Sequence, residues 1–188
     1  MRATFVALIL LALACLTSSQ ISASPSHFKP TNRGMTWTVK KEPQVGNGWA
    51  GIWGCDSFCD AYNGDTSCSS SRPILCIRYY KSMFPPATTS PALNYYYGWS
   101  GGIVDTTNNV VGSTITSQAV GDSICQSQLG ASDWKMAEFH MGHRMASGGS
   151  WNWGSAVRGG WNFWAYFATT YTNRAWVWID DQPNGNCD

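Results

Sequence analysis

The stretch that decides the fold reads SQAVGDSICQSQLG over residues 117–130. Ser117 is placed to accept a hydrogen bond from a free N–H of the first helical turn, and Gly130 is suited to the left-handed conformation that ends many helices. Between them, apolar side chains recur at helical spacing, at Val120, Ile124, Cys125 and Leu129. The stretch therefore predicts an α-helix over 118–129 with a cysteine on its buried side.

Strand patterns lie on both sides of this helix. Segments with aromatic or β-branched residues, bounded by turn-forming residues, predict strands at residues 35–39, 74–80, 134–140, 161–168 and 174–180. The glycine-rich segment 141–160 is expected to be a long loop, and long loops in compact domains are often functional. We therefore expect the α+β class: a small disulfide-stapled domain of mostly short antiparallel strands with one main helix, about 118–129.

Residues 1–23 have the pattern of a signal peptide. Arg2 precedes the apolar run 5–16, and small residues follow, with a cleavage point after Ala23. The run is too short to span a bilayer. The tripeptide ending at Cys15 also resembles the lipobox of bacterial lipoproteins, but ordinary cleavage fits the pattern better. We therefore expect a secreted, extracellular protein with no membrane span.

Cleavage there leaves about 165 residues, the size of one domain. Residues 24–48 are polar and contain prolines, which predicts a loose N-terminal arm. Residues 49–188 are expected to form a single cysteine-bridged, tryptophan-rich domain, with a cysteine-rich part at 49–81 and a second part at 95–188.

The charge balance is close to neutral. The chain has 12 Lys and Arg against 11 Asp and Glu, and only 12% of its residues are charged. Such a surface gives no electrostatic basis for binding nucleic acid or anionic membranes. The 11 tryptophans instead indicate a large aromatic core, with rings to spare for a surface site.

Six cysteines lie after residue 23, and an even number in an exported chain predicts three disulfides. Export also favours disulfides over a zinc site built from the first four. Spacing along the chain favours the bonds Cys55–Cys59, Cys68–Cys76 and Cys125–Cys187. The alternative for the first four cysteines is Cys55–Cys68 with Cys59–Cys76.

Glu138, His140 and His143 form a group with metal-ligand character. On a strand, Glu138 and His140 share a face, and His143 follows across Gly142. Two imidazoles and a carboxylate suit zinc or copper. The alternative is that these are hydrogen-bonded residues at a strand end, and on that interpretation no cofactor is expected.

Two further patterns indicate structure more than chemistry. Residues 98–102 match the G-x-S-x-G pattern of serine hydrolases, but no helix start follows, so a glycine turn is favoured over a catalytic Ser100. Asp180 and Asp181 would point to opposite faces of a strand and are expected to end it and open a turn.

Trp151, Asn152 and Trp153 lie in the glycine-rich segment, where rings are hard to bury. Aromatic faces beside an amide suit sugar rings, whose C–H faces pack on π-systems while their hydroxyls form hydrogen bonds. These three residues are therefore candidates for glycan binding.

Residues 120–130, followed by WKMAE at 134–138, resemble the C-type-lectin-like domain. The stretch WVWIDD at 176–181 is similar to that family's W-I-G-L strand, and Cys187 is similar to its closing cysteine. The tripeptide at 182–184 resembles its calcium- and sugar-binding tripeptide, which implies ligand roles for Gln182 and Asn184. This resemblance covers residues 95–188, the lectin-like part.

The chain also resembles a set of uncharacterised secreted proteins. The shared blocks are GDTSC at 64–68, PILCI at 73–77, MAEFH at 136–140, IDDQP at 179–183 and NC at 186–187. This resemblance implies a shared fold and brings no activity with it.

Together these patterns favour a non-catalytic extracellular binding protein with a glycan as ligand. The first alternative is a structural or extracellular-matrix protein, with matrix material as its partner. The second is a metal-dependent secreted enzyme using Glu138, His140 and His143. No nucleic-acid partner is expected, and the sequence leaves the oligomeric state open.

Overall fold

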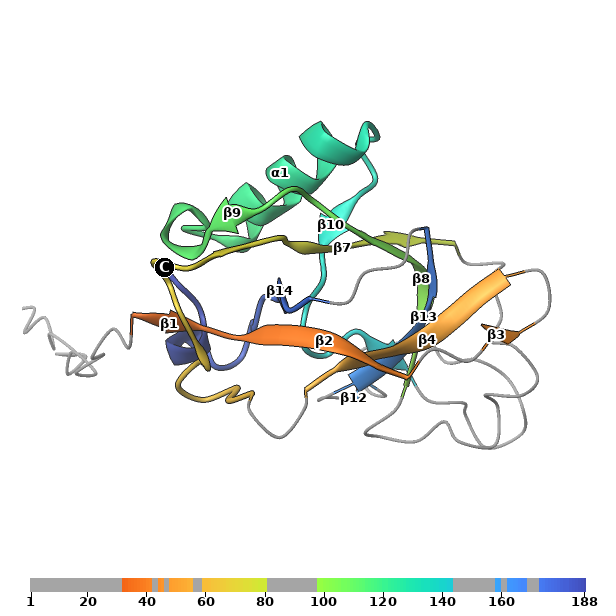
Figure 1. Ribbon diagram of the computed structural model, residues 1–188, viewed down its shortest axis with the longest axis horizontal. Helices are drawn as coiled ribbons and strands as arrows, with labels where there is room; N and C mark the ends of the chain where they lie inside the picture. The colour runs from red at the N-terminus through yellow and green to blue at the C-terminus, as the bar shows by residue number, and fades with distance from the viewer. Residues whose placement is uncertain are drawn as a thin grey trace, which may run out of the picture.

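The computed structural model describes residues 32–41, 44–45, 48–55, 59–80, 98–143, 158–159, 162–168 and 173–188 (Figure 1). Their elements, in chain order, are β1 (Arg33–Gly34), β2 (Thr36–Lys41), β3 (Gln44–Val45), β4 (Gly48–Gly54), β5 (Thr66–Ser67), β6 (Ser71–Arg72), β7 (Leu75–Tyr79), β8 (Gly98–Thr106), β9 (Val110–Val111), the 3-10 helix η2 (Gly112–Thr114), α1 (Gln118–Leu129), β10 (Lys135–Met136), β11 (Gly142–His143), β12 (Arg158–Gly159), β13 (Asn162–Phe167), β14 (Ala175–Trp176) and the 3-10 helix η4 (Pro183–Gly185).

The expected fold class is confirmed: short strands predominate, with one α-helix among the described residues. Seven strands form a half-barrel sheet in the order β10-β7-β8-β13-β4-β2-β14. Neighbours in this order are antiparallel except β8 and β13, which run parallel. Among the described residues, no helix is long and apolar enough to cross a membrane.

The two edges of the half-barrel meet at β14. On one side, β14 pairs with β2, where Trp176 lies opposite Thr36. On the other side, Trp176 forms a bridge with Ile74, and Trp178 forms one with Glu138, just after β10. The chain end after β14 is therefore held against residues 137–140, which are far from it in sequence.

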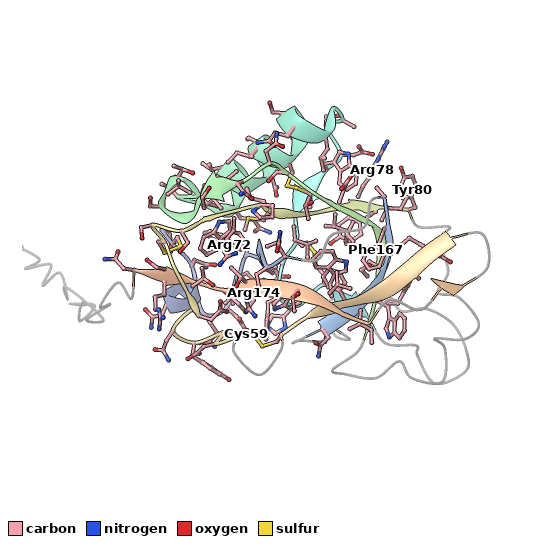
Figure 2. All side chains as sticks on the ribbon, viewed as in Figure 1. Cys59, Arg72, Arg78, Tyr80, Phe167 and Arg174 are labelled. Atoms are coloured by element: carbon pink, nitrogen blue, oxygen red, sulfur yellow. A yellow bond between two sulfur atoms is a disulfide. The ribbon has the colours of Figure 1, made fainter. Side chains whose placement is uncertain are left out.

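Alternating side chains give the sheet two apolar faces. On β7, Leu75 and Ile77 point into the half-barrel, whereas Cys76 points outward toward α1. Figure 2 shows side chains filling the space between β7 and the strands β2 and β4. The largest buried members of this interior are Met35, Trp37, Trp53, Leu75, Ile77, Val104, Phe163 and Ile179.

Helix α1 begins and ends as expected. The Ser117 hydroxyl accepts a hydrogen bond from the Val120 N–H, and Gly130 takes a left-handed conformation with φ of 75°. Gly121 and Cys125 are its buried residues. The helix packs closely on β10, where a Cβ at Gly121 would lie 2.4 Å from the Met136 sulfur. Figure 1 shows α1 outside the sheet, above β7 and β10.

One of the three expected disulfides is confirmed and two are wrong. Cys55 bonds to Cys59, as expected, but Cys76 bonds to Cys125 and Cys68 bonds to Cys187. The expected bonds Cys68–Cys76 and Cys125–Cys187 do not form, because strand alternation turns Cys76 to the outer face, directly opposite α1. Cys68 instead follows β5, beside the C-terminal segment.

The expected loose arm at 24–48 is also corrected where the structure describes it. Residues 36–41 form β2, which lies within the sheet between β4 and β14. Met35 and Trp37 are completely buried in the interior. The strand expected at 35–39 is present, but the polar composition of the arm concealed that it lies inside the sheet, because Thr36 and Thr38 alternate with the buried side chains.

Candidate functional site

The candidate site lies where the chain end after β14 meets residues 137–140. The Phe139 N–H donates to the Trp178 carbonyl at 2.9 Å, and the Trp178 N–H donates to the Ala137 carbonyl at 2.9 Å. These two bonds fix the segments side by side. They bring Glu138 and His140 next to Asp180 and Asp181, which follow Trp178 after one intervening residue, Ile179.

His140 and Asp181 form the closest polar contact of the site. The imidazole Nε2 lies 2.8 Å from the Asp181 Oδ2. The His140 side chain is 17% exposed and that of Asp181 is 49% exposed, so the pair faces solvent from a partly sheltered position. The Phe139 ring packs edge-on against the imidazole at a centroid distance of 4.6 Å, which limits how the imidazole can tilt.

Glu138 lies beneath this pair and is only 3% exposed. Its Oε1 accepts a hydrogen bond from the His140 backbone N–H at 2.9 Å. Burial raises the pKa of Glu138 from its ordinary value of 4.5 to about 7. The bond from His140 opposes this shift, while the negative charge of Asp180 and its hydrogen bond with Glu138 add to it. At a pH below about 7, Glu138 therefore keeps its proton.

The loop carrying the two aspartates is held by Asn186, which is itself buried. The Ile179 N–H donates to the Asn186 Oδ1 at 3.0 Å, and the Asn186 amide donates to the Ile179 carbonyl at 2.6 Å. Both backbone groups of Ile179 are thus used. The next two residues, Asp180 and Asp181, leave the sheet as a bend instead of continuing it.

One ligand atom from each of His140, Asp180 and Asp181 lies within 4.8 Å of the others. Metal ligands on about 2.0 Å bonds at tetrahedral angles are roughly 3.3 Å apart, so small side-chain rotations would close these atoms on one ion. One imidazole nitrogen with two carboxylate oxygens is a donor set that suits zinc.

This group differs from the expected metal set of Glu138, His140 and His143. The structure brings the first two together, but the carboxylates beside them are Asp180 and Asp181. His143 lies in β11, where its backbone pairs with Trp99 of β8 and Arg158 of β12. As expected, Asp180 and Asp181 end the strand and open a turn. Because the regular strand ends before them, their carboxylates do not point to opposite faces, as they would on a strand, and can lie near one another.

The expected glycan residues lie in two places. Gln182 directly follows the aspartate pair, and Asn184 lies two residues further on; both are half-buried. The Gln182 carbonyl accepts a hydrogen bond from the Gly185 N–H at 2.9 Å. Trp151, Asn152 and Trp153 lie outside the described residues. The glycan role of all five residues stays a prediction.

The G-x-S-x-G pattern forms neither an active-site elbow nor the expected turn. Ser100 lies in the middle of β8 and is completely buried. Gly101 has a φ of 76°, and the register with β13 shifts there between Trp164 and Tyr166. These features are those of a β-bulge.

No protein-family model, curated protein or solved structure matches the chain. The resemblances drawn from the sequence therefore stay predictions.

Proposed function

We propose that this is a secreted, extracellular protein that binds rather than catalyses, and that its site takes a zinc ion on His140, Asp180 and Asp181. The observation that carries the proposal is the convergence of these three side chains from two distant segments, with ligand atoms within 4.8 Å of one another.

The surroundings of the three side chains support a metal site. Backbone pairing with Trp178 and the two bonds from Asn186 hold both segments before any ion binds. Preorganised ligands of this kind lose little freedom on binding. Glu138 contacts Asp180 from the buried side and serves as a hydrogen-bonding support, since such partners orient metal ligands.

Binding rather than catalysis is supported by the position of Glu138. It is the buried carboxyl nearest the three ligands, but it is 3% exposed and already bonded to the His140 backbone. It therefore has no open path to a substrate. The three disulfides support export, because such bonds persist in oxidising compartments.

Isothermal titration of zinc into the EDTA-treated, fully oxidised protein at pH 7.5 tests the proposal. We expect one zinc per chain, with affinity at least tenfold lower in each of H140Q, D180N and D181N, about 1.4 kcal/mol or more. The matched control is D188N, which removes an exposed carboxylate outside the group and should leave the affinity unchanged.

Three outcomes would contradict the proposal. The first is absence of binding at 100-micromolar zinc. The second is full affinity in D180N and D181N. The third is tight binding of calcium with none of zinc, which would show that the carboxylates alone form the site and that the imidazole has no role.

A further inference from the structure

The Cys55–Cys59 disulfide closes a much shorter loop than the other two disulfides do. Its cysteines are four residues apart, whereas the others join residues 49 and 119 apart. Cys59 is half-buried and packs against the edge of the interior, and Figure 2 shows it at the lower edge of the molecule, below β2. By contrast, Cys76 and Cys125 are completely buried. An attacking thiol therefore has more access to Cys59 than to that pair.

The third disulfide is also enclosed. Cys68 is 5% exposed. The sulfur of its partner, Cys187, packs against Gly34 and Gly112. If either glycine carried a Cβ atom, that atom would lie 2.7 Å (Gly34) or 3.0 Å (Gly112) from the Cys187 sulfur. Although Cys187 is half-buried as a residue, close backbone packing thus shields its sulfur.

The described segment that starts at Cys59 packs, through Ala61, against the loop 179–185, which carries the two aspartates. Ala61 is 1% exposed, and its carbonyl oxygen lies 2.6 Å from the place where a Cβ at Gly185 would be. On the same side, that Cβ would lie 2.4 Å from the Ile179 Cδ1. Ala61, Gly185 and Ile179 therefore form one close-packed contact, and Asp180 follows Ile179 directly.

We propose that Cys55–Cys59 is the exchangeable disulfide of this protein and that its reduction lowers the zinc affinity of the His140–Asp180–Asp181 site. The regulatory half of this inference rests on the proposed function. Reduction would release Cys59 from the end of β4, so that Ala61 no longer holds the 179–185 loop in place.

The exchange uses two molecules of a low-molecular-weight thiol such as glutathione. The first thiolate attacks the Cys59 sulfur, forms a mixed disulfide and breaks the Cys55–Cys59 bond, and Cys55 leaves as a thiolate that takes up a proton. The second thiolate attacks the sulfur of the bound glutathione and releases Cys59, which also takes up a proton. The products are two protein thiols and one glutathione disulfide, with two electrons transferred to the protein.

The exchange half is tested on the native full chain. The protein is equilibrated with glutathione buffers of increasing reducing strength, free thiols are alkylated, and the labelled cysteines are mapped by mass spectrometry. We expect Cys55 and Cys59 to be labelled at a glutathione ratio at which the other four are still bonded. Labelling of all six together, or of any other pair first, overturns the inference.

The regulatory half is tested in two forms that lack free thiols, since a free thiol would itself bind zinc. One is C55S/C59S, and the other is the wild-type chain alkylated at Cys55 and Cys59 after mild reduction. We expect the zinc affinity of both to be at least fivefold lower than that of the oxidised protein. The alkylated form keeps the test valid if the serine variant does not fold.

Unchanged zinc affinity in these two forms overturns the regulatory half, even if the disulfide exchanges first. If the oxidised wild-type protein binds no zinc, the proposed function fails and the regulatory half fails with it. The order of labelling then still decides whether Cys55–Cys59 is the exchangeable bond.

Discussion

The Nε2 of His140 lies 2.8 Å from the Oδ2 of Asp181, although 41 residues separate them in the chain. The contact exists because β14 joins the two edges of the half-barrel and brings Trp178 against Glu138. The site is thus a product of the sheet's closure. Changes that loosen this closure should weaken the site even when they leave its side chains intact.

The stability of the metal-free protein should fall as pH rises from about 4.5 to about 7. The pKa of Glu138 is about 7 in the folded chain and near 4.5 when unfolded, so the folded state binds more protons across that window. Its contribution is fully present below about pH 4.5 and is lost above about 7, a change on the order of 3 kcal/mol. Urea unfolding in EDTA across this range measures it.

The E138Q variant is the control for this prediction. A neutral amide reproduces the protonated carboxyl, because it can accept from His140 and donate to Asp180. The free energy of unfolding of E138Q should therefore lack the fall with pH that Glu138 causes in the wild type. At pH 8, E138Q should be more stable than the wild type. If wild type and variant show the same pH dependence, the folded pKa of Glu138 is not raised.

Replacing Cys68 and Cys187 by serine should lower the melting temperature more than replacing Cys55 and Cys59. In the chain-entropy model, a separation of 119 residues corresponds to about 5 kcal/mol, and one of four residues to about 2 kcal/mol. C68S/C187S should thus melt about 10 °C or more below wild type. C55S/C59S is the matched comparison, and an equal or larger loss there would contradict the ranking.

The Arg174→Met variant should destabilise the fold by about 3 kcal/mol. Arg174 donates to both the hydroxyl and the carbonyl of Thr36, and its Nη2 lies 3.3 Å from the Asp65 Oδ1. The Asp65 side chain is 5% exposed, so the variant leaves a buried carboxylate without its cation. Denaturant unfolding measures the loss.

R78M provides the matched control for that variant. Its ion pair with Asp133 is exposed, at 34% and 53%, and exposed pairs contribute at most about 1 kcal/mol. If R78M and R174M lower the free energy of unfolding equally, the Thr36–Asp65–Arg174 network contributes no more stability than a surface ion pair.

Asn186→Ala should weaken both the fold and the site. The change leaves the N–H and carbonyl of buried Ile179 without their partners, which costs about 2 kcal/mol or more. Because Asp180 follows Ile179, zinc affinity should fall as well. N186D keeps the acceptor but loses the donor, so its stability and its zinc affinity should both lie between those of wild type and N186A. Unchanged zinc affinity in N186A would show that Asn186 does not support the site.

The sequence predicted the parts of the fold that local chemistry determines. The caps at Ser117 and Gly130 set the helix ends, and apolar patterning located β7 and β13. The sequence also predicted a strand at 35–39, but it placed that strand in a loose arm, because an alternating pattern of threonine with Met35 and Trp37 has a polar average. Its burial depends on the interior that other strands provide.

The disulfides and the site depend on pairings that spacing does not reveal. Cys68 and Cys76 are close in sequence but face different partners, since Cys76 turns toward α1. Asp180 and Asp181 were expected to end a strand and open a turn, and they do, but this expectation did not indicate which residues they would lie beside. The bridge between Trp178 and Glu138 places them beside His140, and such a long-range bridge has no local sequence pattern.

The most direct test of the zinc site is a crystal structure of the zinc-loaded, oxidised protein, with anomalous data on both sides of the zinc absorption edge. We expect one anomalous peak per chain, about 2.0 to 2.2 Å from the His140 Nε2 and from a carboxylate oxygen of both Asp180 and Asp181. A zinc-loaded crystal with no peak there, or with His140 still bonded to Asp181 and the ion elsewhere, would contradict it.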